Sequence, residues 1–143
     1  MRFFLVLTLY TLLPMQSAWA GDIALQIGGH RVRAAITDTP HSRERGLMQS
    51  APLCENCGML FVFPQAGRYS FWMQDTPLPL AIAFIAADGS IIDIDEMQSN
   101  TTLRHSARNN FLYALEMNKG WFTSHAIKPG DRVGGLQRVP AGK

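Results

Sequence analysis

Two cysteines separated by two residues, Cys54 and Cys57, are the part of this chain best suited to covalent chemistry. The same spacing occurs in metal-binding and thiol-exchange motifs of cytosolic proteins. Redox pairs of the thioredoxin kind place the first cysteine at a helix start, which lowers its pKa. Here the pair follows Pro52-Leu53 and precedes an apolar run that predicts a strand. We therefore expect a structural disulfide worth about 2 kcal/mol, since its ring is small, with redox exchange and copper handling as alternatives.

Soft metal ligands are present but are not grouped along the sequence. Two cysteines without a second pair are too few for a closed zinc site. Methionines inside apolar runs usually fill gaps in a core. Beyond residue 20 the chain has five methionines and four histidines: Met48, Met59, Met73, Met97, Met117, His30, His41, His105 and His125. Since the histidines lack ligand spacing, we predict no metal and no cofactor.

An aromatic run that enters a polar turn is the best candidate for a ligand site. Trp72 ends the run, and Pro77 follows the turn. Loops carried by rigid strands commonly host binding groups. We expect this turn and the polar stretch 98–109, which is long enough to act as a lid, to form a cleft. The predicted ligand-binding residues are Trp72, Gln74, Asp75, Thr76 and His105. The alternative is that Trp72 belongs to the core and Asp75 only stabilises its own turn.

Glu116 is the lone acid in the apolar run 111–117. A buried acid is either paired or neutral, and we expect a structural ion pair with Arg45. Catalysis is the alternative, with Asp75 and Glu116 as the two acids of a hydrolase. No Gly-x-Ser-x-Gly nucleophile motif is present, so we do not expect the protein to be an enzyme, although the sequence leaves this open.

The first twenty residues have the three-part pattern of a secretory signal peptide. Arg2 precedes an uncharged run from Phe3 to Leu13, and Ala18-Trp19-Ala20 supplies the small residues that a signal peptidase reads. The run is about half the length that crosses a bilayer. We predict cleavage between Ala20 and Gly21 and a periplasmic or secreted protein, in a compartment where disulfides persist.

Charge and length exclude several classes of partner. The chain has 13 Lys and Arg against 11 Asp and Glu, and loss of Arg2 leaves 12 against 11, a net charge near +1. Such a balance argues against binding nucleic acid or a membrane surface. We expect a small neutral ligand or an envelope component as partner, and no membrane span after cleavage. The oligomeric state stays open. Removing 20 of 143 residues leaves 123, one domain over 21–137 with a loose tail at 138–143.

Short apolar runs separated by turn signals predict a mainly β (α+β) fold. Asp88-Gly89 between two apolar runs is the strongest hairpin signal. Thr39-Pro40 predicts a helix start, and Gly46 can end that helix. The expected strands cover 22–27, 30–37, 59–63, 69–73, 80–86, 91–97, 111–117 and a last segment near 132–133, with a second short helix at 121–126. About eight strands and two short helices predict a compact, partly closed barrel or sandwich.

The order of these motifs resembles a known family. Arg43-Glu44-Arg45-Gly46-Leu47-Met48, Gly58-Met59-Leu60-Phe61-Val62-Phe63-Pro64, Ser70-Phe71-Trp72-Met73, Tyr113-Ala114-Leu115-Glu116 and Gly130-Asp131-Arg132-Val133 are similar to motifs of domain of unknown function 192. The resemblance implies a small, mainly β, often exported domain and no known reaction. Ser50 and Ala81 stand where the family usually has Arg and Asp. The hypothesis that relatives pair these two groups in an ion bridge requires the two positions to face each other.

These observations favour a small ligand-binding or accessory module of the cell envelope. The alternatives are a hydrolase acting on envelope material through Asp75 and Glu116, and a redox or copper-handling factor that uses Cys54 and Cys57. A pocket with converging acids would favour the first alternative. Exposed thiols beside Met48 would favour the second.

Overall fold

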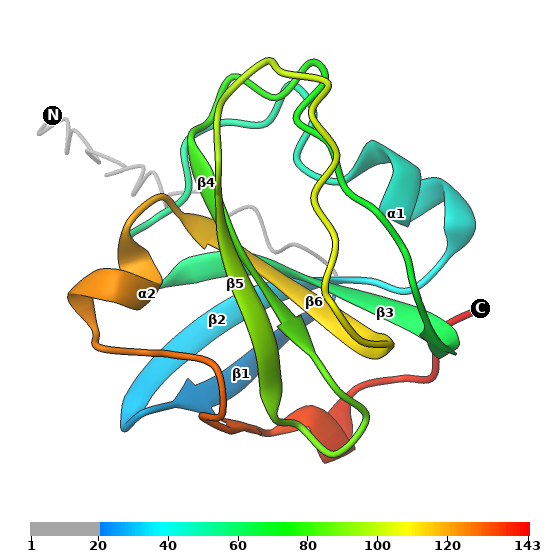
Figure 1. The fold of residues 1–143 in the computed structure, drawn as a ribbon, viewed down its shortest axis with the longest axis vertical. Coiled ribbons are helices and arrows are strands. Elements are labelled where there is room, and N and C mark those ends of the chain that lie inside the picture. Colours follow the sequence, from blue (N-terminus) through cyan, green and yellow to red (C-terminus); the bar gives the residue numbers. More distant parts are fainter. Residues whose placement is uncertain (1–20) are drawn as a thin grey trace, which may run out of the picture.

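The computed structural model describes residues 21–143, so the predicted signal peptide and its cleavage site lie outside the described residues, apart from Gly21. Seven strands form one sheet in the order β5-β4-β6-β3-β2-β1-β7 (Figure 1). The strands are β1 (Asp22–Ile27), β2 (His30–Thr37), β3 (Cys57–Gly67), β4 (Leu80–Ile85), β5 (Ile91–Met97), β6 (Phe111–Asn118) and β7 (Val133–Gly134). The helices are α1 (Pro40–Arg45), α2 (Trp121–Ser124) and the 3₁₀ turn η1 (Leu136–Arg138).

The sheet is mixed because one connection crosses over. β2 and β3 are parallel and are joined through α1, whereas the other paired strands are antiparallel. The strands twist and curl into a half-barrel (Figure 1). The predicted mainly β fold with two short helices is therefore confirmed, as a half-barrel rather than a sandwich.

α1 begins and ends where local chemistry predicts. The Thr39 hydroxyl accepts a hydrogen bond from the Ser42 N–H at 3.1 Å, and the Ser42 hydroxyl accepts one from the Thr39 N–H. This pair satisfies two of the backbone donors that a helix start leaves free. Gly46 then leaves the helix with a φ of +48°, a conformation that disfavours a side chain. The short helix thus directs residues 43–48 back over the sheet.

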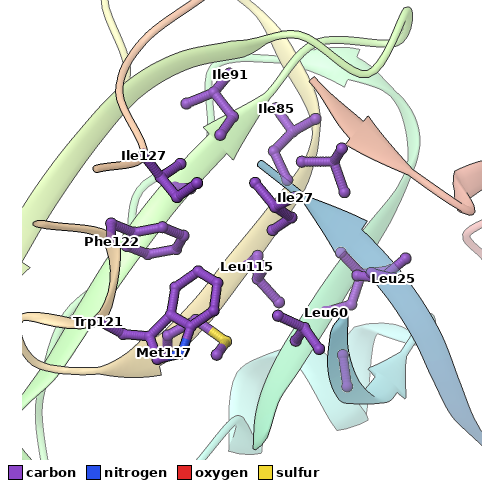
Figure 2. Close-up of a cluster of buried hydrophobic side chains, with 14 of the residues drawn as sticks. Leu25, Ile27, Leu60, Ile85, Ile91, Leu115, Met117, Trp121, Phe122 and Ile127 are labelled. Carbon is purple, nitrogen blue, oxygen red and sulfur yellow. The ribbon is translucent and has the colours of Figure 1, made fainter. Parts of the chain in front are cut away.

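Two hydrophobic clusters bury opposite faces of the sheet. The first cluster includes Leu25, Ile27, Leu60, Leu115 and Met117 and is covered by Trp121 and Phe122 of α2 (Figure 2). The second cluster contains Leu47, Met59, Phe61, Phe63, Met73, Leu80, Ile82, Phe84, Met97, Ala107, Phe111 and Ala114. β3 and β4 contribute to both clusters, so these two strands are buried on both faces.

Residues 69–73 do not form the predicted strand. β3 continues past Pro64 to Gly67 with a shift in its pairing to β6, and 69–73 contributes a single bridge between Phe71 and His105. The apolar run 69–73 predicts a strand, but its backbone groups pair with the loop 98–109 instead of a sheet strand. The sheet accordingly has seven strands rather than about eight.

The C-terminal residues contact the start of α1, and the loose tail expected at 138–143 stays a prediction. The Lys143 N–H donates to the Asp38 carbonyl at 2.7 Å, and the Lys143 carbonyl accepts from Nη2 of Arg43 at 2.7 Å. Val139 packs against the first cluster. Long-range contacts hold this segment, and such contacts leave no local pattern in the sequence.

Ser50 and Ala81 do not face each other. Ala81 belongs to the first cluster, whereas Ser50 lines a surface pocket together with Leu47 and Met59 of the second. The expectation that these two positions are opposed was wrong, because the sheet lies between them.

Candidate functional site

A pocket of about 320 Å³ lies against the second cluster, between α1 and the segment 69–72. Its walls are aromatic: the rings of Phe63 and Tyr69 stack with their centroids 3.8 Å apart, and the ring of Phe71 meets that of Phe61 edge-on at 4.9 Å. Trp72 and Thr76 also line it. Its charged lining residues are Arg43, Glu44, Arg45, Arg104 and Glu116. We call this space the aromatic pocket.

Glu116 of β6 is the buried acid of the aromatic pocket. Its register pairs it with Met59 of β3 and Ile82 of β4, which belong to the second cluster. The residue is 4 % exposed, and its carboxyl makes no hydrogen bond or ion pair with any of residues 21–143. Burial raises the pKa of Glu116 from 4.5 to about 8, because removing water disfavours the charged form. At neutral pH the group is mostly a neutral carboxylic acid, with one O–H to donate.

The expected ion pair between Arg45 and Glu116 does not form among the described residues, although both side chains line the aromatic pocket. Arg45 is exposed at the last position of α1. Arg43, in contrast, makes structural contacts. Its guanidinium donates hydrogen bonds to the carbonyls of Asp38 at 2.8 Å and Val62 at 2.9 Å. It also lies 5.3 Å from the centre of the Phe63 ring. Neither arginine is paired with Glu116 among residues 21–143.

Only some residues of the predicted ligand-binding turn line the aromatic pocket. Trp72 is half-buried and Thr76 is buried, and both line the aromatic pocket. The guanidinium of Arg104 lies 4.1 Å from the centre of the Trp72 ring. Gln74 and Asp75 are exposed and do not line this pocket.

Asp75 has a backbone role in the turn. Its φ of +53° is a conformation that Asp tolerates better than most residues, and its carbonyl accepts from the Gln49 N–H at 2.9 Å. This contact ties the turn to the segment after α1. The two acids of the hydrolase alternative are thus not brought together, since Glu116 lines the aromatic pocket and Asp75 does not.

The stretch 98–109 is bonded along its length to the segment 69–76. The backbones of Phe71 and His105 exchange hydrogen bonds of 2.8 and 2.9 Å, and the Met73 N–H donates to the Thr101 carbonyl at 3.0 Å. Ser106 adds a hydroxyl bond of 2.6 Å to the Tyr69 carbonyl. The predicted meeting of this stretch with the aromatic run occurs, but as a bonded pair of segments.

His105 is buried and lies beside an acid. Its Nδ1 is 3.3 Å from Oδ2 of Asp95, within hydrogen-bond distance. Nε2 is buried and has no hydrogen-bond partner in the described part of the chain. His105 does not line the aromatic pocket. Its expected place in the ligand site stays a prediction.

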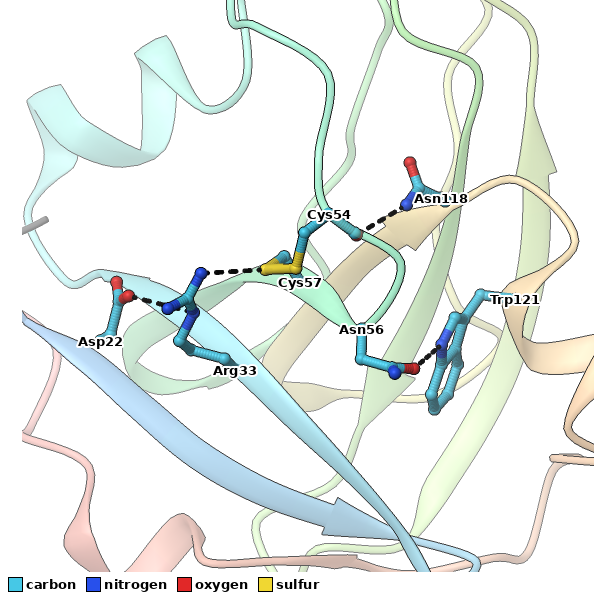
Figure 3. The surroundings of a disulfide bond; sticks show 7 residues. All are labelled: Asp22, Arg33, Cys54, Asn56, Cys57, Asn118 and Trp121. Atoms are coloured by element: carbon cyan, nitrogen blue, oxygen red, sulfur yellow. Dashed lines mark hydrogen bonds and ion pairs between the residues drawn. A yellow bond between two sulfur atoms is a disulfide. The ribbon is translucent and has the colours of Figure 1, made fainter. Parts of the chain in front are cut away.

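The sulfur atoms of Cys54 and Cys57 lie 1.96 Å apart, a disulfide distance, at the start of β3 (Figure 3). Both residues line a second pocket of about 300 Å³. Nη2 of Arg33 donates to Sγ of Cys57 at 3.4 Å. Met48 lines the aromatic pocket rather than this one. Among residues 21–143, no group of three or more His, Cys, Asp or Glu side chains is placed to hold a metal ion.

Sequence reasoning missed three kinds of contributor to these sites. The aromatic walls come from Phe61, Phe63, Tyr69 and Phe71, which were expected to be ordinary strand residues. Arg104 reaches the pocket from the long polar stretch, where nothing marked it out. Arg33 lies in the expected strand 30–37 without any local signal, and its contact with Cys57 depends on the parallel pairing of β2 and β3.

Comparisons with known proteins agree with this fold. A protein of Sinorhizobium meliloti 1021, described as a "putative transcription regulator", has a crystal structure with 30% sequence identity and a TM-score of 0.77; the match covers 81% of this chain and 95% of that one. A protein of unknown function from Novosphingobium aromaticivorans DSM 12444 has 28% identity and a TM-score of 0.77, with 80% of this chain and 85% of that chain covered. No curated protein matches the chain.

Within residues 21–143 no helix has the length and apolar character needed to cross a bilayer. The family model DUF192, described as "Uncharacterized ACR, COG1430", matches residues 23–135, which include both pockets' strands and the motifs that carry the resemblance. The chain belongs to the DUF192 family.

Proposed function

We propose that this protein is an exported ligand-binding domain of the cell envelope, and that its aromatic pocket takes a small uncharged molecule. The observation that carries the proposal is Glu116, a carboxylic acid that is 4 % exposed, lines a pocket with aromatic walls and has no hydrogen-bond partner among residues 21–143. A buried polar group without a partner is costly. A ligand that accepts its hydrogen bond would supply the partner that the protein does not.

The protonation of Glu116 favours a ligand that accepts a hydrogen bond. With its pKa raised to about 8, Glu116 is mostly neutral at pH 7 and can donate to a hydroxyl or carbonyl oxygen. Arg43 is already bonded to backbone carbonyls, and Arg104 lies over Trp72. A polyol, a sugar or an amide with one flat apolar face would match the aromatic walls and this donor.

The aromatic rings supply the apolar part of binding. Trp72 is half-buried, so part of its surface remains open to a partner. Aromatic side chains contribute large contact areas at a low cost in conformational entropy. A sugar ring or an amide plane resting on these rings while its oxygen reaches Glu116 would use both features of the pocket.

A thermal-shift screen tests this proposal. Mature protein is screened with neutral mono- and disaccharides, neutral dipeptides and metal salts, since a ligand that binds only the folded state raises its melting temperature. For any hit, Glu116→Leu should abolish the shift and Glu116→Gln, which keeps a neutral hydrogen-bonding group, should retain part of it. Glu55→Gln, at an exposed position outside the pocket, is the matched control. Hits that bind equally to wild type and Glu116→Leu would contradict the proposal.

A second candidate function is hydrolysis with Glu116 as general acid. The raised pKa favours it, because general acids must hold their proton near neutral pH. A hydrolase of this kind needs a second carboxylate beside the general acid. Asp75 does not line the aromatic pocket, and Glu44 is its other carboxylate. Turnover of nitrophenyl glycosides or esters that is lost in Glu116→Gln would favour this candidate over simple binding.

A further inference from the structure

The disulfide lies at the surface with its two sulfur atoms in different surroundings. Cys54 is exposed, whereas Cys57 is half-buried at the start of β3. β2 and β3 are paired in parallel with Arg33 opposite Cys57, so the backbone register places this arginine beside the sulfur. Nη2 of Arg33 lies 3.4 Å from Sγ of Cys57, and Asp22 holds the guanidinium from the other side with an Nε–O distance of 3.6 Å (Figure 3).

The loop between the cysteines is anchored to another part of the fold. The side-chain amide of Asn118 donates to the Cys54 carbonyl at 3.0 Å, and Nε1 of Trp121 donates to Oδ1 of Asn56 at 3.0 Å (Figure 3). Neither contact involves a sulfur atom. The loop therefore keeps its anchors when the disulfide is opened, and the two thiols stay close together.

From this geometry we infer that Cys54–Cys57 is a thiol–disulfide exchange site that oxidises a dithiol substrate, with Cys54 as the sulfur that is attacked and Cys57 as the one that leaves. Attack on an exposed sulfur is unhindered, and a thiolate leaves faster when a neighbouring group stabilises its charge. Exposure selects Cys54 for attack, and the Arg33 contact selects Cys57 as the leaving group. Exposure and the arginine contact therefore assign consistent roles to the two sulfur atoms.

One turnover balances without any further reactant. A substrate thiolate forms a bond to Sγ of Cys54 as the bond between Cys54 and Cys57 breaks, and the electron pair leaves on Sγ of Cys57 beside Arg33. The substrate's second thiolate then attacks its own sulfur in the mixed disulfide and releases Cys54. The substrate leaves with one disulfide, having lost two electrons and two protons, and the protein carries two thiols.

The second pocket gives the substrate room beside the sulfur atoms. Its volume is about 300 Å³, and Leu53 and Met59 give it an apolar surface next to the cysteines. A peptide with two cysteines matches this lining, because the residue next to its cysteine can rest on that surface.

The experiment compares two arginines of the same strand. Arg31 and Arg33 are both exposed in β2 and two residues apart, so both side chains leave the same face. Arg31 pairs with Gln26 and lies away from the disulfide, so Arg31→Gln removes the same charge without removing the sulfur contact. Mature oxidised protein is mixed with a synthetic peptide that carries two cysteines, and loss of the protein disulfide is followed by acid quench and mass spectrometry.

We expect Arg33→Gln to slow the reaction about threefold, while Arg31→Gln leaves the rate unchanged. When glutathione replaces the peptide as the attacking thiol, the acid quench should trap a mixed disulfide on Cys54. A trapped adduct on Cys57, equal effects of the two substitutions, or a disulfide that the peptide cannot reduce in folded protein would each overturn the inference. Circular dichroism of each variant establishes that it is folded.

Discussion

Nε1 of Trp121 donates a hydrogen bond to Oδ1 of Asn56 at 3.0 Å and so links α2 to the loop between the cysteines. Trp121 is 4 % exposed and covers the first cluster, so its N–H has little access to water (Figure 2). Asn56 itself is exposed. The exposed side-chain amide of Asn56 therefore gives the indole N–H of Trp121 an acceptor that the apolar first cluster does not provide.

Asn56→Ala should lower the free energy of unfolding by about 1–2 kcal/mol, because it leaves a mostly buried indole N–H without its partner. Urea unfolding followed by tryptophan fluorescence measures the change. Asn109→Ala, at an exposed loop position, is the control and should change stability little. Equal effects of the two substitutions would show that the bond to Trp121 contributes nothing.

Glu116 should make the folded state less stable as the pH rises. Its pKa is about 8 in the folded protein and 4.5 in the unfolded chain, so the folded state holds the extra proton between these values. The contribution of this group is therefore fully present below pH 4.5 and is lost as the pH rises to 8, with a slope of up to about 1.4 kcal/mol per pH unit. Urea unfolding at a series of pH values measures the slope.

Glu116→Gln should remove most of this slope, since glutamine does not titrate. Glu55→Gln, at an exposed position, should keep the slope of the wild type. The interpretation of Glu116 as a neutral buried acid fails if its substitution leaves the pH profile as it was.

Arg43 and Arg45 should differ sharply in their effect on stability. Arg43→Met removes hydrogen bonds to the carbonyls of Asp38, Val62 and Lys143, and we expect a loss of about 2–3 kcal/mol. Arg45→Met removes an exposed charge at the end of α1 and should change stability by less than about 0.5 kcal/mol. Thermal and urea unfolding of both variants measure the difference, and a larger loss for Arg45→Met would contradict the assignment.

Export should produce a mature chain that begins at Gly21. Ala18 and Ala20 meet the small-residue requirement of signal peptidase. N-terminal sequencing of protein recovered from the periplasm or the medium tests this, and Ala20→Pro should leave the precursor uncleaved. Intact Met1 on exported protein would rule out the predicted cleavage.

Local signals in the sequence were sufficient for many elements of the fold. The strands expected at 22–27 and 30–37 match the observed bounds of β1 and β2, and Asp88-Gly89 predicted the hairpin of β4 and β5. Thr39 and Gly46 marked both ends of α1. These features depend on side-chain periodicity, capping and turn conformation, which act between residues a few positions apart.

Only the tertiary structure decided which residues share a site. Arg33 contacts Cys57 across 24 positions because β2 and β3 are parallel neighbours, and Arg43 rather than Arg45 reaches the Val62 carbonyl. Glu116 lines the aromatic pocket because its register places it between Met59 and Ile82. Strand pairing and burial join residues that are distant in the chain, and a pattern within one short segment carries no information about such neighbours.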